Sequence, residues 1–214
     1  MEPKEFVVEF RRLRASAILR TDDQGKARRL MEAAVRGGFR IVEFTLTIPG
    51  AFDLISEFSK KDGLVVGAGT VLTVEQARGA VEAGARFLVS PVTDEAVIRA
   101  AADLGVAVMP GAHTPTEMFR AHRAGAQLVK LFPSPGAGPA YIRQIRGPLP
   151  FLKVVPTAGV DVSNAADFLE AGAWAVGLVG SLFEAEDVEA RARELLAAVS
   201  AAQISTVRSP EPVT

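Results

Sequence analysis

The sequence of 214 residues contains no cysteine and only two histidines. Without cysteine, the chain can form no disulfide bond, no thiolate metal site and no thiol nucleophile. Neither histidine has a cluster of carboxylates beside it, so we expect no three-ligand metal site. His122 falls in a predicted helix, where a surface or packing role is expected. His113 follows Pro110 and Gly111 in a predicted loop and could line a pocket.

Long hydrophobic runs and a large excess of charge are also missing. No apolar run approaches the roughly 20 residues that a transmembrane helix needs. Residues 1–14 are charged throughout and lack the apolar core of a signal peptide. The formal net charge of −1 leaves no electrostatic footprint for nucleic acid or an anionic membrane. With 49% hydrophobic and 23% charged residues, the sequence predicts a soluble, cytoplasmic, globular protein.

What the sequence does contain is a regular alternation of strand-like and helix-like segments. A leading helix is expected at residues 4–13. Eight strands follow, at residues 15–19, 40–46, 64–68, 87–89, 107–109, 127–132, 152–155 and 173–179. Each strand precedes a helix, at residues 24–36, 51–60, 74–83, 95–104, 117–124, 141–146, 165–171 and 188–198.

Repeated units of this kind imply parallel strands joined by right-handed helical crossovers. They can close as a (β/α)8 barrel or stay open as a doubly wound sheet. Eight units at this chain length favour the barrel, and no GxGxxG or Walker-type loop supports the open sheet. We therefore expect one α/β barrel domain over residues 1–200. Residues 201–214, with several polar residues and two prolines, should form a loose tail.

Five glycines fall shortly before predicted strands, where each could end the preceding helix. A glycine in this position adopts a positive φ without the steric penalty that a side chain would add. The five are Gly38, Gly84, Gly105, Gly125 and Gly172.

One lysine stands inside an apolar strand-like run. Lys130 lies at the centre of the sixth predicted strand, between branched and aromatic residues. If this strand is buried, the lysine must reach solvent at the strand's end or lose much of its charge. A desolvated amine is a good nucleophile at neutral pH and forms Schiff bases with carbonyl compounds. The alternative is an ordinary lysine in an edge strand or a loop.

In a (β/α)8 barrel the chemistry lies on the loops that follow the carboxyl ends of the strands. Here the residues that close the strands are mostly small or polar, but they also include an arginine, a carboxylate and a lysine. They are Arg20, Glu43, Thr45, Thr47, Ser90, Pro91 and residues 67–70, 110–113, 130–133, 156–159 and 177–181. Lys153 is a rival nucleophile, but it enters at the start of its strand, at the end opposite the chemistry.

Alternation along the second strand predicts which way the Glu43 side chain points. Val42, Phe44 and Leu46 can face the helices, which leaves Glu43 and Thr45 toward the barrel axis. A carboxylate there is an ion-pair partner for the buried lysine, a proton-transfer group, or both. A close carboxylate would oppose a lowered lysine pKa, so we expect Glu43 to be offset from Lys130 rather than locked in a dry ion pair.

Two glycine-containing turns follow the last two strands, at residues 156–160 and 177–181. Loops at these places in α/β barrels often bind phosphate through backbone N–H groups. Glycine is equally expected in any tight turn, so the prediction of phosphate binding depends mostly on the position of these turns after the last two strands.

Several ordered segments together resemble the class I 2-keto-3-deoxy-6-phosphogluconate (KDPG) aldolases. This family also holds 4-hydroxy-2-oxoglutarate (KHG) aldolase and 2-keto-3-deoxy-6-phosphogalactonate (KDPGal) aldolase. The similarity runs from about residue 18 to residue 182 through GFRIVEFT at 38–45, VGAGTV at 66–71, VSP at 89–91, MPG at 109–111, TPTE at 114–117, KLFP at 130–133 and VPT at 155–157.

The resemblance implies a (β/α)8 barrel, commonly a homotrimer, that needs no metal or other cofactor. Such an enzyme cleaves KDPG into pyruvate and glyceraldehyde 3-phosphate, with KDPGal or KHG as alternative substrates. Lys130 matches the Schiff-base lysine and Glu43 the carboxylate that moves protons. The resemblance assigns substrate binding to Arg20, Thr70, Pro91, Phe132, Thr157, Gly159, Gly180 and Ser181, with Arg20 on the carboxylate and the last three at the phosphate end.

The chain departs from the family pattern at three places. Thr47 stands where many members carry an arginine, and Ala158 stands where the first of two glycines is usual. The segment 177–181 is about one residue longer than usual. A phosphosugar epimerase or isomerase with Glu43 as its base is a second interpretation. A non-catalytic sugar-phosphate sensor is a third.

Overall fold

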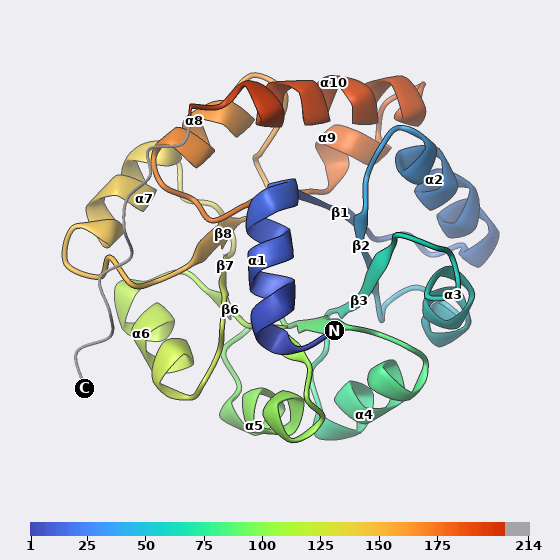
Figure 1. Cartoon of the computed structure of the whole chain (residues 1–214), viewed down its shortest axis with the longest axis horizontal. Coiled ribbons are helices and arrows are strands. Elements are labelled where there is room, and N and C mark those ends of the chain that lie inside the picture. The colour runs from blue at the N-terminus through green and yellow to red at the C-terminus, as the bar shows by residue number, and fades with distance from the viewer. Residues whose placement is uncertain (204–214) are drawn as a thin grey trace.

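Helices and strands alternate along residues 1–203, the part of the chain that the computed structural model describes. Figure 1 shows the strands gathered around the middle of the molecule, most of the helices outside them and α1 across one end. In chain order the elements are α1 (Pro3–Leu13), β1 (Ala15–Leu19), α2 (Gln24–Arg36), β2 (Ile41–Thr45), α3 (Ala51–Phe58), β3 (Val65–Gly69), α4 (Val74–Glu82), β4 (Phe87–Val89), α5 (Glu95–Asp103), β5 (Ala107–Met109), β6 (Gly111–Ala112), α6 (Pro115–Arg123), β7 (Val129–Leu131), α7 (Pro139–Arg146), β8 (Val154–Pro156), α8 (Ala165–Glu170), β9 (Val176–Leu178), α9 (Gly180–Phe183) and α10 (Val188–Ala201).

The strands form two parallel sheets that curl around the centre. One sheet has the order β5-β4-β3-β2-β1-β9, and the other has the order β6-β7-β8. Pro110 alone separates β5 from β6, because proline has no N–H to donate to a strand ladder. Its carbonyl still accepts a hydrogen bond of 2.9 Å from the Lys130 N–H. At the other junction a parallel bridge joins Thr157 to Gly177. The fold is therefore an α/β fold whose parallel strands curl around the centre. Residues 1–203 contain nine strands, where eight were expected.

Alternate side chains of the strands enter two different cores. Val42 and Phe44 of β2 pack in the layer between the sheet and the helices, where the ring centroids of Phe44 and Phe58 lie 5.0 Å apart. Ile41 of the same strand belongs to a second cluster inside the curled sheet, together with Phe87 of β4. This is the alternation expected from the sequence, and it turns Glu43 inward.

Helix α1 covers the amino ends of the strands. Pro3 lies in its first turn, and Glu2 and Glu5 form a capping box there. Phe6 and Phe10 are buried, and the ring of Phe6 stacks on Phe87 with 4.5 Å between centroids. In Figure 1, α1 lies across the middle of the strands. The carboxyl ends of the strands, which carry the candidate site, therefore lie at the opposite end of the molecule.

The limits of the elements differ from expectation by a few residues at most. All five glycines expected to end helices adopt positive φ values, between +68° and +119°. Helix α10 continues to Ala201. The expected single domain over residues 1–200 and tail over residues 201–214 stay predictions. The rest of the expected tail, from residue 204 on, lies outside the described residues. None of the helices described within residues 1–203 is long and apolar enough to cross a bilayer.

Candidate active site

Lys130 occupies the middle of β7 and points inward. Its neighbours Val129 and Leu131 pack in the outer core, so alternation turns the lysine to the inside. The residue is only 5% exposed, and its Nζ lies 5.0 Å from the centroid of the Phe132 ring. Burial lowers the pKa of the Lys130 amine, the charge of Glu43 partly raises it again, and the charge of Arg20 lowers it further. The structure thus favours a neutral, nucleophilic amine.

Glu43 lies inside the curled sheet on β2 and is fully buried. Burial raises the pKa of its carboxyl, and the positive charges of Lys130 and Arg20 offset part of that rise. Within residues 1–203, neither carboxylate oxygen has a hydrogen-bond partner. No ion pair within 4.0 Å joins Glu43 to Lys130 in this part of the chain. The two groups influence each other electrostatically without the dry contact that would have counted against their roles.

The backbone around Glu43 is shaped to hold the carboxylate. A Cβ atom added at Gly69 of the neighbouring strand β3 would collide with the Glu43 carboxylate. Thr45, also buried, lies with its Oγ1 2.9 Å from the Oγ1 of Thr47. Thr47 therefore serves as a hydrogen-bond partner of Thr45 just beyond the end of β2.

Three predicted substrate-binding residues close β1, β3 and β4. Arg20 follows β1 and donates a hydrogen bond of 3.4 Å from Nη2 to Oγ1 of Thr70. Thr70 follows β3 with a φ of +58°, a conformation that is uncommon for a residue with a side chain. Pro91 follows β4, and its backbone lies so close to Gly111 that a side chain at Gly111 would collide with it. The structure joins Arg20 to Thr70 and places Pro91 beside the Pro110 junction.

The residues predicted for the phosphate end follow β8 and β9. Thr157 is buried, and its N–H donates to the Leu131 carbonyl at 3.2 Å. Gly159 lies in the next turn, with a φ of +70°. The Ser181 hydroxyl donates to the Val160 carbonyl at 2.7 Å, which ties this turn to the start of α9. A groove of about 350 Å³ is lined by Arg20 and Gly180 together with residues of α2 and α9, so these two predicted residues border the same groove.

Several contacts that stabilise the site were not predicted by sequence reasoning. Nδ1 of His113 lies 2.9 Å from the Pro133 carbonyl, and the Tyr141 hydroxyl donates to the His113 carbonyl at 2.6 Å. Ser134 donates from Oγ to the Thr157 carbonyl at 2.9 Å. His113 thus positions the chain that follows Lys130. The only sequence signal for these contacts was that His113 falls in a carboxyl-end loop.

The remaining sequence candidates lie away from the site. The ring of His122 packs on Phe151 with 4.8 Å between centroids, which is the packing role expected for it. Burial lowers the pKa of His122, and the Lys153 charge adds to that effect. Lys153 lies just before β8, 5.4 Å from the Trp174 ring at the amino end of the strands. In residues 1–203, no three His, Asp or Glu side chains are grouped so that they could hold a metal ion.

Lys130 has a lowered pKa, and the buried Glu43 carboxylate has no hydrogen-bond partner within residues 1–203. A lysine and a carboxylate of this kind on parallel strands suit Schiff-base chemistry. The family model for KDPG and KHG aldolase matches residues 8–199. A probable 2-dehydro-3-deoxy-6-phosphogalactonate aldolase from Rhizobium meliloti (strain 1021) is 40% identical over 192 residues, or 86% of this chain and 91% of the relative. The chain belongs to the KDPG and KHG aldolase family, and it is an aldolase, an aldehyde-lyase.

Solved structures show the same fold. A native KDPGal structure is 35% identical, with a TM-score of 0.77 over 88% of this chain and 93% of the other. A cube-shaped protein cage designed by fusing symmetric oligomeric domains is 34% identical, with a TM-score of 0.80 over 88% of this chain and 72% of the other.

Proposed function

We propose that this aldolase cleaves a 2-keto-3-deoxy-6-phosphohexonate through a Schiff base on Lys130, with Glu43 as the proton-transfer group. The observation that carries this proposal is the pair itself, an inward lysine of lowered pKa and a buried carboxylate of raised pKa that has no hydrogen-bond partner among residues 1–203. The family provides the reaction class, and the geometry supports these two residues as its reacting groups.

The reaction begins at the lysine. The neutral Lys130 amine attacks the C2 carbonyl carbon of the substrate, and loss of water leaves an iminium ion that draws electrons from the neighbouring C3–C4 bond. Glu43 accepts the proton of the C4 hydroxyl, the C3–C4 bond breaks, and glyceraldehyde 3-phosphate leaves. Glu43 then returns a proton to C3 of the enamine. Water attacks the resulting iminium carbon, releasing pyruvate and the free amine of Lys130.

The other predicted residues would bind the two ends of the substrate. Arg20 offers a guanidinium to the substrate carboxylate, and its hydrogen bond to Thr70 fixes part of its position. Thr70, Pro91 and Phe132 would border the pyruvate half. Thr157, Gly159, Gly180 and Ser181 would border the phosphate half, where backbone N–H groups can donate to phosphate oxygens.

We also propose that the two sheets act as one closed (β/α)8 barrel. Two contacts support closure, namely the Pro110 link between β5 and β6 and the bridge from Thr157 to Gly177. The homotrimer expected from the family stays a proposal. It is supported by the likeness to a cage built from symmetric oligomeric domains, and light scattering on the purified protein would test it.

Trapping the imine tests the mechanism. The protein is incubated with pyruvate and borohydride, digested, and mapped by mass spectrometry. We expect a single reduced adduct on the peptide that contains Lys130, no adduct in Lys130→Ala, and an unchanged adduct in Lys153→Ala. Lys153 is the matched control because it lies at the opposite end of the strands. A folded protein without an adduct at Lys130 would overturn the assignment and favour an isomerase-type reaction.

The choice of sugar epimer follows the relatives. We propose KDPGal as the preferred substrate, because the Rhizobium relative and one similar structure carry that name. KDPG is the second candidate, since the family model is named for it. Initial rates with KDPGal and KDPG at equal concentrations decide between them. If the initial rate with KDPGal exceeds the rate with KDPG, the preference for KDPGal is supported. A lower rate with KDPGal overturns that preference without affecting the imine mechanism.

A further inference from the structure

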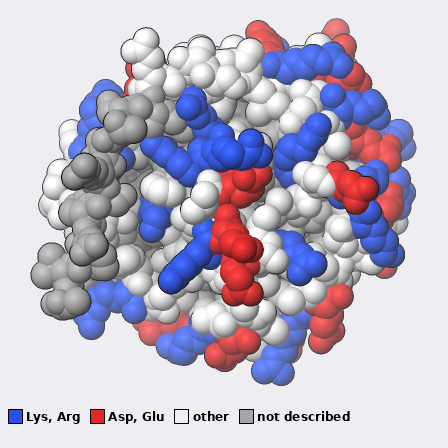
Figure 2. All heavy atoms as spheres, viewed as in Figure 1, with Lys and Arg blue, Asp and Glu red and all other residues white. Residues whose placement is uncertain are grey.

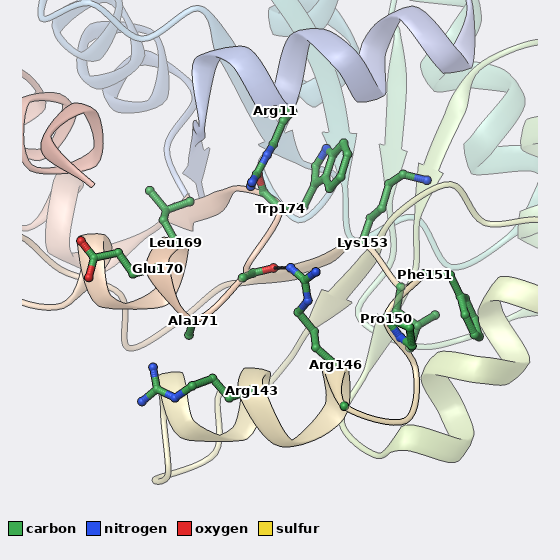
Figure 3. A pocket seen from close by; sticks show the side chains of 13 residues that line it. Arg11, Arg143, Arg146, Pro150, Phe151, Lys153, Leu169, Glu170, Ala171 and Trp174 are labelled. Atoms are coloured by element: carbon green, nitrogen blue, oxygen red, sulfur yellow. Dashed lines mark hydrogen bonds between the residues drawn. The ribbon is translucent and has the colours of Figure 1, made fainter. Parts of the chain in front are cut away.

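A second cavity lies at the end of the molecule opposite Lys130. It has a volume of about 340 Å³ and opens between α1, α7, α8 and the start of β8. Figure 3 shows the side chains of Arg11, Arg146, Lys153 and Trp174 around it, with Arg143 and Glu170 on one side. Its lining comes from the amino ends of the strands, so it is separate from the site that the aldolase reaction uses.

The lining is strongly cationic. Arg11, Arg143, Arg146 and Lys153 surround the cavity, whereas Glu170 is the one acidic residue that lines it. In the described part of the chain, none of these four cations forms an ion pair with a carboxylate, although eight ion pairs occur elsewhere. Figure 2 shows this face, with Lys and Arg side chains beside the acidic residues that run down its middle.

Two of the guanidinium groups are held in place by backbone carbonyls. Arg11 donates from Nη1 to the carbonyls of Ala173 and Trp174, at 2.8 and 3.0 Å. Arg146 donates from Nη1 to the carbonyl of Gly172 at 2.7 Å. A guanidinium has five N–H donors, so each retains further donors for another acceptor. Three consecutive carbonyls of the α8–β9 turn thus preorganise two cations side by side.

Other positive charges lie close to the partly buried Arg11. Burial lowers the pKa of its guanidinium, and the neighbouring charges of Arg146 and Arg14 lower it further. Like charges held together in a partly buried place repel each other, and a bound anion would convert that repulsion into attraction. The ring of Trp174 lies between Arg11, at 5.1 Å from the guanidinium carbon, and Lys153, at 5.4 Å from Nζ.

We propose that this cavity is a binding site for a small phosphate anion, either inorganic phosphate or a phosphate monoester. Paired guanidinium groups match the geometry of phosphate oxygens and form charge-assisted, bidentate hydrogen bonds with them. A dianion also balances four cations and one carboxylate better than a single carboxylate would. The bound anion would link α1 to α7 and to the α8–β9 turn, and would therefore stabilise the helix that covers the strands.

The chain provides its own reporter for this site. Trp174 is the single tryptophan of the sequence and lies at the cavity, so its fluorescence reports on the cationic site rather than on the carboxyl ends of the strands. The full chain is titrated with inorganic phosphate and, in parallel, with glycerol 3-phosphate, while chloride keeps the ionic strength constant. We expect a saturable change in Trp174 emission with at least one of them, and the tighter one identifies the class of ligand.

Two variants show whether the response belongs to this site. Arg143→Gln removes one cation whose side chain is exposed and makes no hydrogen bond within residues 1–203, so the fold should persist. We expect it to weaken phosphate binding at least tenfold. Arg29→Gln is the matched control, because it removes an exposed arginine of α2 outside the cavity, and its affinity should equal that of the unmodified chain.

Two results would overturn the proposal. One is a Trp174 emission that shows no saturable change with either phosphate compound. The other is an equal affinity in Arg143→Gln and Arg29→Gln, which would mean general electrostatic attraction without a site. Neither result affects the aldolase assignment, because pyruvate trapping on Lys130 in the same Arg143→Gln variant is measured independently.

Discussion

The pKa values of Lys130 and Glu43 each depend on the charge of the other group and on the charge of Arg20. Burial disfavours the charged form of both candidate groups, the ammonium and the carboxylate, so it shifts their pKa values in opposite directions. It therefore lowers the pKa of Lys130 and raises that of Glu43. Arg20, which is exposed, stabilises the Glu43 carboxylate and destabilises the Lys130 ammonium at the same time. One arginine at the rim thus favours the neutral amine while helping to keep the base charged.

The pH dependence of imine formation should separate these contributions. Only the neutral amine attacks a carbonyl, so the rate of pyruvate trapping should rise with pH and follow the lowered pKa of Lys130. Glu43→Gln removes a negative charge that stabilises the ammonium, so the midpoint should move to lower pH. Arg20→Gln removes a positive charge that destabilises the ammonium, so the midpoint should move to higher pH. Trapping rates with cyanoborohydride across the pH range give all three midpoints.

The turnover rate of Glu43→Gln provides a second test of the role of Glu43. A positioned carboxylate that transfers protons typically contributes a factor of ~100 to 10,000, so Glu43→Gln should lose turnover by about that factor while still forming the imine. Glu82→Gln, which changes an exposed carboxylate of α4, is the control and should leave both midpoint and turnover unchanged. Midpoints that move in the same direction in Glu43→Gln and Arg20→Gln would contradict the charge arrangement.

At the scale of elements, the turn after β8 carries a conformational cost. Ala158 has a φ of +63° and Gly159 a φ of +70°, so two successive residues lie in the left-handed region. An L-residue there costs roughly 1 to 2 kcal/mol relative to its ordinary conformation, whereas glycine has no such penalty. A glycine at position 158 would therefore avoid a conformational penalty that Ala158 carries.

Ala158→Gly should stabilise the protein. The substitution removes the left-handed penalty but adds conformational entropy to the unfolded chain, so the expected net gain is about 0.5 to 1 kcal/mol in the free energy of unfolding by urea. Ala137→Gly is the matched control, because Ala137 lies in a turn without a positive φ. The control should lose about 0.4 to 1 kcal/mol. If both variants lose stability alike, the turn does not hold Ala158 in the left-handed conformation.

The elements show what the sequence could predict and what it could not. Periodicity located eight strands and their helices, since the alternation of apolar residues reflects which face is buried. Helices α6 and α7 begin at Pro115 and Pro139, two residues before the expected starts, because proline is favoured in the first helical turn. The short elements β6 and α9 were not predicted. Two and four residues carry too little periodicity to be recognised.

The candidate site divides in the same way. Alternation along β2 predicted an inward Glu43, and the structure buries it inside the curled sheet. For Lys130 the sequence left open whether the amine reaches solvent or is desolvated, and the structure leaves it only 5% exposed. The fit of Gly69 against the Glu43 carboxylate and the hydrogen bond between His113 and Pro133 could not be predicted. Both depend on side-chain and strand packing between residues about 20 or more positions apart, which no local pattern records. Sequence reasoning thus proposed the candidate reacting groups and did not predict the contacts that position them.

At the scale of the whole molecule, the two ends of the strands have separate roles. The carboxyl ends hold the candidate reacting groups, which are buried and costly to desolvate. The amino ends are covered by α1, whose buried Phe6 and Phe10 extend the inner core. Helix α1 also receives a hydrogen bond of 3.0 Å from the Trp174 indole to the Val7 carbonyl. Stability gained at this end offsets the cost of burying charge at the other.

Phe6→Ala tests whether α1 is part of the cooperative fold. Phe6 is 1% exposed and stacks on Phe87, and truncating a buried phenylalanine typically costs about 3 to 5 kcal/mol in the free energy of unfolding. Val8→Ala is the control on the same helix, because Val8 is 68% exposed and should change stability by less than about 0.5 kcal/mol. Urea unfolding measures both. Equal losses would mean that α1 unfolds separately from the curled sheet. With α1 inside the cooperative unit, folded Phe6→Ala should keep the same pH midpoint for imine formation, since Lys130 lies at the far end of the strands.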